Sequence, residues 1–169
     1  RVKAIELIIL DRNASTKECR SAGAALAKRI GRSSAFIFCA ALKRTDDFIL
    51  GCMLRKYAFD KNSTKNKKGN FAKITFMHNK PENLQTSINA IEAVVSGVHF
   101  TRDLVNEPAN ILTTTEFADR LRDLSNHGLN VEVFEEDEMK ALGMSALLAV
   151  GQGSESPSKM VVMQWNGAE

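Results

Sequence analysis

The sequence predicts an α/β fold whose first half contains βαβ units and a parallel sheet. Short apolar runs of strand length alternate with segments of helical periodicity, which is the pattern of strands joined by helical crossovers. The connections between them are short, as in compact parallel domains. Hydrophobic residues make up 44% and charged residues 25% of the 169 residues, so the composition excludes a disordered chain and a collagen.

The cysteines and the hydropathy indicate the compartment. The three cysteines, Cys19, Cys39 and Cys52, are few and odd in number, so they fit reduced core residues better than a disulfide framework. No apolar run reaches the roughly 18 residues that a membrane-spanning helix needs, and the first residues lack a signal-peptide pattern. We therefore expect a cytoplasmic protein with no membrane partner.

The first half supplies three apolar runs and two helical patterns. Ser15-Thr16-Lys17-Glu18 matches a capping box, which predicts a helix that ends at Gly31. Asp46 or Asp47 opens a second helix over residues 48–59. The inner face of the first helix should carry Cys19, Ala22, Leu26 and Ile30. The predicted buried strands span residues 4–10, 35–40 and 71–77.

The middle of the chain contains a basic loop and the longest helical pattern. Residues 61–70 are polar and aperiodic, which predicts an exposed loop. Pro81-Glu82 opens a helix over residues 82–106, and Pro108 stops it. Its apolar stripe comprises Ile88, Ile91, Val95 and Val98, continued by Leu104 and Val105.

The last third mixes short helices and strands. Thr113 to Glu116 form a second capping-box pattern. A short amphipathic helix with Phe117, Leu121 and Leu124 follows it and ends before Gly128. Residues 129–134 alternate as a strand does, and residues 135–142 begin with acidic side chains, as a helix N-terminus prefers. Two more buried strands are predicted over residues 146–150 and 160–165.

Charge divides the chain. Residues 1–83 contain 18 Lys and Arg against 7 Asp and Glu, whereas residues 84–169 contain 5 against 13. A change of sign of this size predicts a domain junction near residues 80–110. Two solvated surfaces explain it most simply. The alternative is a nucleic-acid-binding face on the basic half, with four lysines in one loop, Lys61, Lys65, Lys67 and Lys68.

Motifs that would carry chemistry are scarce. His78, His99 and His127 are far apart and fit no zinc motif, and the cysteines lack C-x-x-C spacing. Gly151-Gln152-Gly153-Ser154 lacks the third glycine of a dinucleotide-binding loop, so we interpret it as a turn. The carboxylates of Glu135, Glu136, Asp137 and Glu138 point in different directions on a helix start, so we interpret them as a solvated N-terminus rather than a metal site.

Three segments resemble one known family. Residues 102–118 read R-D-L-V-N-E-P-A-N-I-L-T-T-T-E-F-A, residues 142–153 read L-G-M-S-A-L-L-A-V-G-Q-G, and residues 161–167 read V-V-M-Q-W-N-G. Together they resemble the leucyl (cytosol) aminopeptidase family where its N-terminal domain joins its catalytic domain. G-C-M-L-R-K-Y-A-F-D, residues 51–60, is similar to a helix end of that family. The chain departs from the family pattern at Thr114, where Pro is usual, and at Ser145, where Gly is frequent.

The resemblance implies an arrangement of domains. Residues 1–81 would form a partial N-terminal α/β domain of Rossmann- or macro-like type, and residues 82–107 a linker helix. Residues 108–169 would be the truncated beginning of an α/β metallopeptidase domain. Asp103 on the linker helix and Glu107 before Pro108 are the carboxylates of the most specific motif, and we expect structural roles for both.

The resemblance also implies chemistry for a longer parent protein. That parent would be a cytoplasmic hexamer that hydrolyses N-terminal residues, preferably Leu, from peptides with two divalent metal ions, manganese or zinc. The family's metal-ligand motifs, G-K-G-x-x-F-D, D-M-K-x-D and N-T-D-A-E-G-R, do not occur in this sequence. We therefore expect a fragment without peptidase activity, assign it no catalytic or metal-binding residue, and leave its substrate-binding residues unknown. Some bacterial relatives bind DNA, which keeps the nucleic-acid alternative open, and apolar faces built for absent segments should be exposed.

Overall fold

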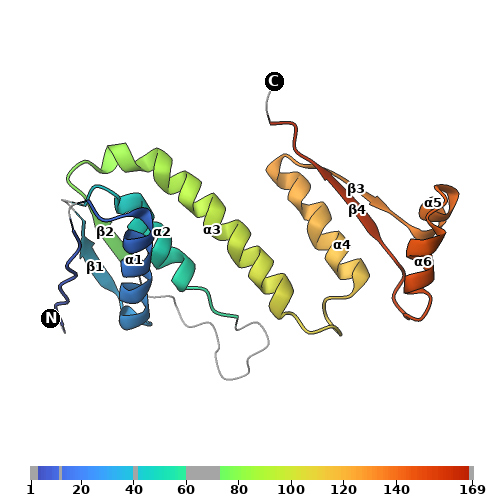
Figure 1. Cartoon of the computed structure of the whole chain (residues 1–169), viewed down its shortest axis with the longest axis horizontal. Coiled ribbons are helices and arrows are strands. Elements are labelled where there is room, and N and C mark those ends of the chain that lie inside the picture. Colours follow the sequence, from blue (N-terminus) through green and yellow to red (C-terminus); the bar gives the residue numbers. More distant parts are fainter. Residues whose placement is uncertain (1–3, 12, 40–41, 60–72, 168–169) are drawn as a thin grey trace. The chain divides into compact units, whose positions relative to one another are not determined.

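The computed structural model describes residues 4–11, 13–39, 42–59 and 73–167. The chain divides into two compact units, Arg1–Asp103 and Leu104–Glu169, and each is described by itself (Figure 1). The basic loop predicted over residues 61–70, with its four lysines, lies outside the described residues. Within the described part, no helix is both long enough and apolar enough to cross a membrane.

The first unit is a βαβ arrangement followed by a long helix. Strands β1 (Ala35–Phe38) and β2 (Ile74–Met77) pair in parallel, from Ala35 opposite Ile74 to Phe38 opposite Met77. Helix α2 (Thr45–Arg55) lies between them in the sequence and packs on α1 (Thr16–Ile30). A short 3-10 helix, η1 (Pro81–Leu84), leads into α3 (Gln85–Asn106). The predicted α/β class with a parallel sheet is confirmed.

Helix α1 begins as its sequence predicts. The Ser15 hydroxyl accepts a hydrogen bond from the Glu18 N–H at 3.3 Å, and the Glu18 carboxylate accepts one from the Ser15 N–H at 2.7 Å. These reciprocal bonds satisfy N–H groups that the first turn of a helix leaves without intrahelical partners. They also hold the pKa of Glu18 below its usual value, because both the backbone and the side chain of Ser15 donate to its carboxylate.

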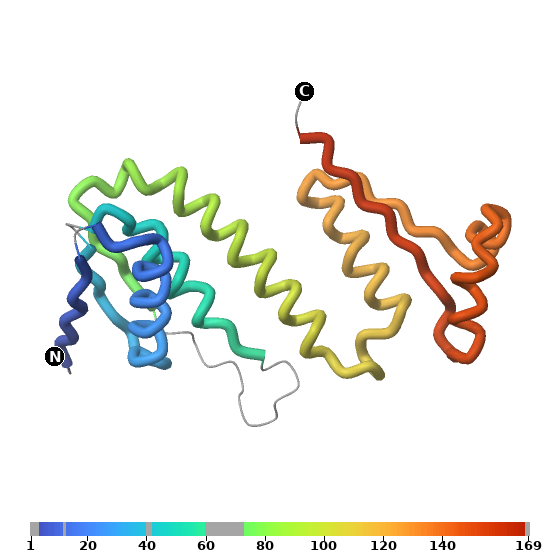
Figure 2. The backbone as a smooth tube through the Cα atoms, in the orientation of Figure 1, coloured from blue at the N-terminus to red at the C-terminus, as the bar shows by residue number. Residues whose placement is uncertain are grey.

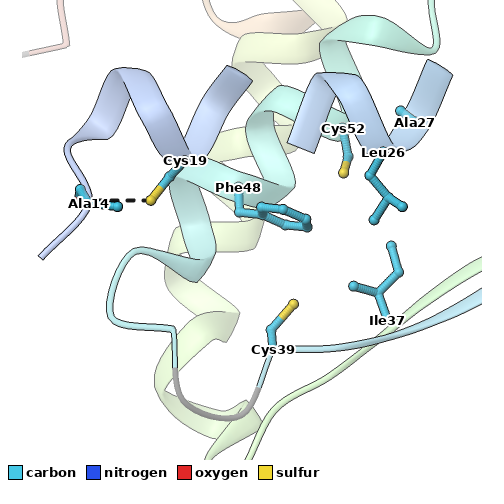
Figure 3. Close-up of a cluster of buried hydrophobic side chains, with 8 residues drawn as sticks. All are labelled: Ala14, Cys19, Leu26, Ala27, Ile37, Cys39, Phe48 and Cys52. Atoms are coloured by element: carbon cyan, nitrogen blue, oxygen red, sulfur yellow. Dashed lines mark hydrogen bonds between the residues drawn. The ribbon is translucent and has the colours of Figure 1, made fainter. Parts of the chain in front are cut away.

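Two apolar clusters form the core of the first unit. The first lies between α1, α2 and β1 and surrounds Phe48, and the second joins α2 to α3 through Ile49, Ile91 and Val95 (Figure 3). The first cluster comprises Ala14, Cys19, Leu26, Ala27, Ile37, Cys39, Phe48 and Cys52. All three cysteines are free and buried. The sheet therefore presents only one face to the helices, with Ile37 inward and Phe36 and Phe38 exposed.

Two glycines allow α1 and α2 to approach closely. A Cβ added at Gly23 would lie 2.1 Å from the Phe48 carbonyl oxygen, and one added at Gly51 would lie 2.1 Å from the Arg20 carbonyl oxygen. The Cys52 thiol donates to the Gly23 carbonyl oxygen across the same contact, at 3.0 Å. The absence of side chains at both glycines thus sets the distance between the helices.

The second unit begins at Leu104 and contains an antiparallel pair of strands, β3 (Asn130–Phe134) and β4 (Met160–Gln164). The other elements are helices α4 (Thr114–Arg122), η2 (Asp123–His127), α5 (Glu136–Ala141) and α6 (Ser145–Gly151). Gly128, which follows η2, has φ 89°, a conformation that glycine adopts without strain. The helix starts predicted near Thr113 and Glu135 are confirmed.

Four predictions of local structure are wrong. Residues 4–10 form no strand, because their backbone groups make no ladder with any described residue. Three of their apolar side chains point to solvent, so the predicted burial is wrong as well. Residues 146–150 belong to the mostly exposed helix α6 rather than to a buried strand, since Ala-Leu-Leu-Ala is a strong helix-forming sequence. The second predicted helix ends at Arg55 rather than at residue 59. The apolar stripe predicted for α3 is not fully buried, because Val98 and Val105 are exposed.

Candidate functional site

The segment with the most specific motif, residues 102–118, runs from the last turns of α3 to the middle of α4. Its first two residues belong to the first unit and the others to the second. Neither unit brings the motif carboxylates together with a cluster of metal-binding side chains. Among the residues that the structure describes, no group of three or more His, Cys, Asp or Glu side chains could hold a metal ion.

Asp103 and Arg102 hold α3 against the end of α2 through Tyr57. The Tyr57 hydroxyl donates to the Asp103 carboxylate at 2.9 Å. The guanidinium of Arg102 lies 5.1 Å from the centre of the Tyr57 ring, a cation–π distance, and donates to the Leu54 carbonyl at 3.3 Å. That carbonyl belongs to the last turn of α2, where it has no intrahelical partner, so Arg102 caps the helix C-terminus.

His99 completes this cluster from the preceding turn of α3. Its ring centre lies 5.2 Å from that of Tyr57, tilted by 49°. Its Nε2 atom is buried and has no hydrogen-bond partner among the described residues.

The Glu107 carboxylate is buried, with its side chain 3% exposed. Arg120 of α4 donates to it at 3.4 Å and to Glu116 at 2.7 Å, so one guanidinium joins the residue before Pro108 to the first and last turns of α4. The hydrogen bond to Glu116, with the charges of both carboxylates, raises the pKa of Arg120. This arrangement fixes the turn between α3 and α4.

The turn itself is closed by backbone hydrogen bonds. The Pro108 carbonyl accepts from the N–H groups of Ile111 and Leu112, both at 2.9 Å. Thr113 then caps α4 by accepting from the Glu116 N–H at 3.3 Å, and Thr114, where the family usually has Pro, donates its hydroxyl to the Pro157 carbonyl at 2.7 Å. Thr114 therefore ties the start of α4 to the loop before β4.

The carboxylates at the start of α5 accept hydrogen bonds or form an ion pair within the protein, and they do not converge on one point where a cation could bind. Glu138 accepts from the Glu135 N–H at 2.8 Å, and Glu136 accepts from the Ser158 N–H at 2.6 Å. Glu135 pairs with Lys159. Three of the four carboxylates thus have separate partners, which agrees with the interpretation of this segment as a helix N-terminus.

Tyr57, His99, Arg102 and Asp103 are called the Tyr57 cluster below. One open hollow of about 410 Å³ lies beside this cluster, in the first unit. It is lined by Ala24, Gly51, Leu54, Arg55 and Arg102. None of these side chains is a nucleophile or a general base at neutral pH, because arginine stays protonated. The described lining residues therefore supply no catalytic group to the hollow.

The sequence and the fold were compared with known proteins. A sequence model described as the catalytic domain of the cytosol aminopeptidase family matches residues 99–169. A probable cytosol aminopeptidase of Dinoroseobacter shibae is 49% identical over 161 residues, which are 95% of this chain and 33% of the relative. The chain belongs to the cytosol aminopeptidase family. A second relative, from Cereibacter sphaeroides, is 42% identical over 164 residues, 97% of this chain and 33% of the relative.

Solved structures agree with this assignment of fold. The bottromycin maturation enzyme BotP is 27% identical with a TM-score of 0.73, over 91% of this chain and 35% of that one. A tomato leucine aminopeptidase has a TM-score of 0.78 at 22% identity, over 93% of this chain and 35% of that one. The family member described here thus spans about a third of the length of the relatives that it matches.

Sequence reasoning missed the partners of the motif side chains. Arg120 was not singled out, although its spacing of four residues from Glu116 on a helix predicts an ion pair. Tyr57 was noted only as part of the 51–60 motif, and its bond to Asp103 joins residues 46 positions apart. No local pattern reports such a contact.

Proposed function

We propose that this chain is the part of a metal-dependent leucyl aminopeptidase that joins the N-terminal domain to the catalytic domain. The parent would hydrolyse N-terminal residues, with a preference for Leu, from peptides. The 49% identity to a probable cytosol aminopeptidase over nearly the whole chain supports this most strongly. The catalytic-domain match to residues 99–169 supports the assignment of the last part of the chain to that domain.

The proposed metal ions belong to the parent rather than to the residues described here. The described residues contain no cluster of three metal-binding side chains, and the carboxylates Asp103 and Glu107 are engaged with Tyr57 and Arg120. Manganese or zinc is proposed from the family resemblance, and a solved structure of the similar enzyme BotP in complex with Mn supports manganese. When bound, such ions polarise a carbonyl and lower the pKa of a water molecule. No step of that reaction is assigned to residues 1–169.

The role that these residues can perform is structural. The Tyr57 cluster and the Glu107–Arg120–Glu116 contacts fix the two ends of the motif. Peptides, and further copies of the parent in a hexamer, are the proposed partners. A cytoplasmic location is proposed as well, which the names of the relatives support.

The experiment is a comparison of two proteins under one set of conditions. Hydrolysis of leucine p-nitroanilide is measured with added Mn²⁺ for the polypeptide encoded by the complete gene and for the 169-residue chain. We expect turnover by the complete gene product that a chelator abolishes, and none by the 169-residue chain. A complete gene product that does not cleave aminoacyl anilides with any divalent metal would refute the proposed activity.

DNA binding through the basic half is the alternative function, supported by the 18 basic against 7 acidic residues of positions 1–83. Phosphate contacts make affinity fall steeply with salt, so a duplex titration between about 50 and 200 mM salt tests it. Binding that weakens strongly over this range would support the alternative. No binding at about 50 mM salt would dispose of it.

A further inference from the structure

We propose that the hollow beside the Tyr57 cluster binds small organic phosphates, with Arg55 and Arg102 as the anion-binding side chains. Helix α2 packs on α1 and on α3, and the hollow is lined by residues of all three helices (Figure 2). These residues all belong to the first unit. The volume of about 410 Å³ lies within the range of pockets that hold small molecules.

The lining of the hollow combines positive charge with an apolar surface. Of the described residues that line it, two are arginines and none is acidic. The other three, Ala24, Gly51 and Leu54, offer only aliphatic carbon and backbone atoms. A guanidinium presents its N–H groups in a planar fork that matches the oxygen atoms of a phosphate. The lining therefore suits a molecule that has both a phosphate group and an uncharged, apolar part.

Arg102 is held in place by contacts within the protein. Its guanidinium lies 5.1 Å from the centre of the Tyr57 ring and donates to the Leu54 carbonyl at 3.3 Å. Tyr57 is held in turn by its hydrogen bond to Asp103. A side chain that is already ordered loses less conformational entropy when a ligand binds, so these contacts favour binding at Arg102.

Arg55 differs from most other arginines of the chain in having no partner among the described residues. It is exposed in the last turn of α2, and no hydrogen bond or ion pair joins its side chain to another described residue. Its charge there offsets the dipole of α2, but that role does not require a second arginine from α3 at the same hollow. Other arginines pair with carboxylates, namely Arg20, Arg29, Arg44, Arg120 and Arg122.

The size of the hollow favours an organic phosphate over the inorganic ion. Inorganic phosphate would contact the guanidinium groups and leave the apolar part of the lining exposed to water. A ligand with a ring beside its phosphate would also cover Leu54 and Gly51, and burial of that apolar surface adds affinity. Phenyl phosphate is therefore the probe, and phenol and inorganic phosphate each represent one half of it.

The proposal is tested by titrating the ¹⁵N-labelled 169-residue chain with phenyl phosphate and recording backbone amide NMR signals. We expect the Gly51 amide signal to shift and to saturate with a Kd of about 1 mM. Phenol and inorganic phosphate should each bind at least about tenfold more weakly. No shift of the Gly51 signal up to about 10 mM phenyl phosphate would overturn the proposal. So would phenol or inorganic phosphate binding as well as phenyl phosphate does.

Two variants test whether the bound charge is read by the hollow. Arg55→Gln should raise the Kd for phenyl phosphate at least about tenfold, because it removes a charged hydrogen-bond donor. Arg29→Gln is the matched control, since it removes the same charge from an exposed position in the last turn of α1, where the guanidinium pairs with Glu6. It should change the Kd by less than about twofold.

The amide spectra of both variants also report whether the fold is kept, as expected for exposed positions. A Kd that Arg55→Gln leaves unchanged, or that both variants raise equally, would overturn the proposal. The second result would show attraction by the overall positive charge of the first unit in place of a site. None of these results depends on the proposed peptidase activity.

Discussion

The close contact between α1 and α2 makes Gly51 a position where one methyl group should be costly. The Gly51→Ala side chain would lie 2.1 Å from the Arg20 carbonyl oxygen and 2.7 Å from the carbonyl carbon. Both atoms belong to a helix backbone, so no side-chain rotation can relieve the clash. The helices must move apart by about 1 Å to restore ordinary contact in an interior that is close-packed.

The magnitude follows from two opposing effects. Overpacking of a well-packed contact costs about 1–3 kcal/mol, while replacing glycine by alanine inside a helix gains up to about 1 kcal/mol. Because the clash is with backbone and also strains the bond from Cys52 to Gly23, we expect the upper part of that cost and a net loss of about 2 kcal/mol. Gly97→Ala is the matched control, since a Cβ there meets nothing within 4 Å. It should be neutral or stabilising by up to about 1 kcal/mol.

The assay must report on the first unit alone. All three cysteines lie in that unit and are buried, so the reaction of their thiols with an aromatic disulfide, followed against urea, measures its unfolding. We expect Gly51→Ala to shift the midpoint to lower urea and Gly97→Ala to leave or raise it. A Gly51→Ala midpoint equal to or above that of the wild type would refute the reasoning from helix proximity.

Two further predictions concern titration and ion pairs. Burial raises the pKa of Cys52 to about 12 and of Cys39 to about 11, above the ordinary value of 9.0. Because the unfolded chain loses these protons first, the stability that the two thiols contribute is fully present below about pH 9 and declines as the pH rises toward 12. The urea midpoint of the wild-type protein should therefore fall between pH 8.5 and about pH 10.5. It should fall less in the variant that carries both Cys39→Ala and Cys52→Ala. An identical fall in the two proteins would contradict this prediction. Arg120→Gln should destabilise the second unit by about 1–3 kcal/mol, because it removes the guanidinium from the buried Glu107. Arg122 belongs to an exposed ion pair, so Arg122→Gln should lower the stability by at most about 1 kcal/mol. Urea unfolding followed by the single tryptophan, in the second unit, measures both, and equal losses would count against the role of Glu107.

Local signals predicted much of the fold. The capping residues Ser15 and Thr113 mark helix starts because their hydroxyls bond groups only three residues away. The run around Ile37 predicts a strand because it is short and β-branched or aromatic. Such features depend on residues that are close in sequence, and the structure contains them where they were predicted.

Features that depend on distant partners were not predictable. Residues 4–10 have the composition of a strand, but a strand also needs a partner with free backbone groups, and the described residues supply none. The run at Leu147 is apolar enough for either structure, and periodicity cannot decide over five residues. The roles of Asp103 and Glu107 depend on Tyr57 and Arg120, which approach them only in the folded chain.

We propose that residues 1–169 provide the framework of an aminopeptidase without its reacting groups. The most direct test is the hydrolysis of leucine p-nitroanilide by the purified 169-residue chain with saturating Mn²⁺, compared with a mock preparation from the same host. We expect no turnover above that of the mock preparation. Turnover that copurifies with the chain and is absent from the mock preparation would contradict it.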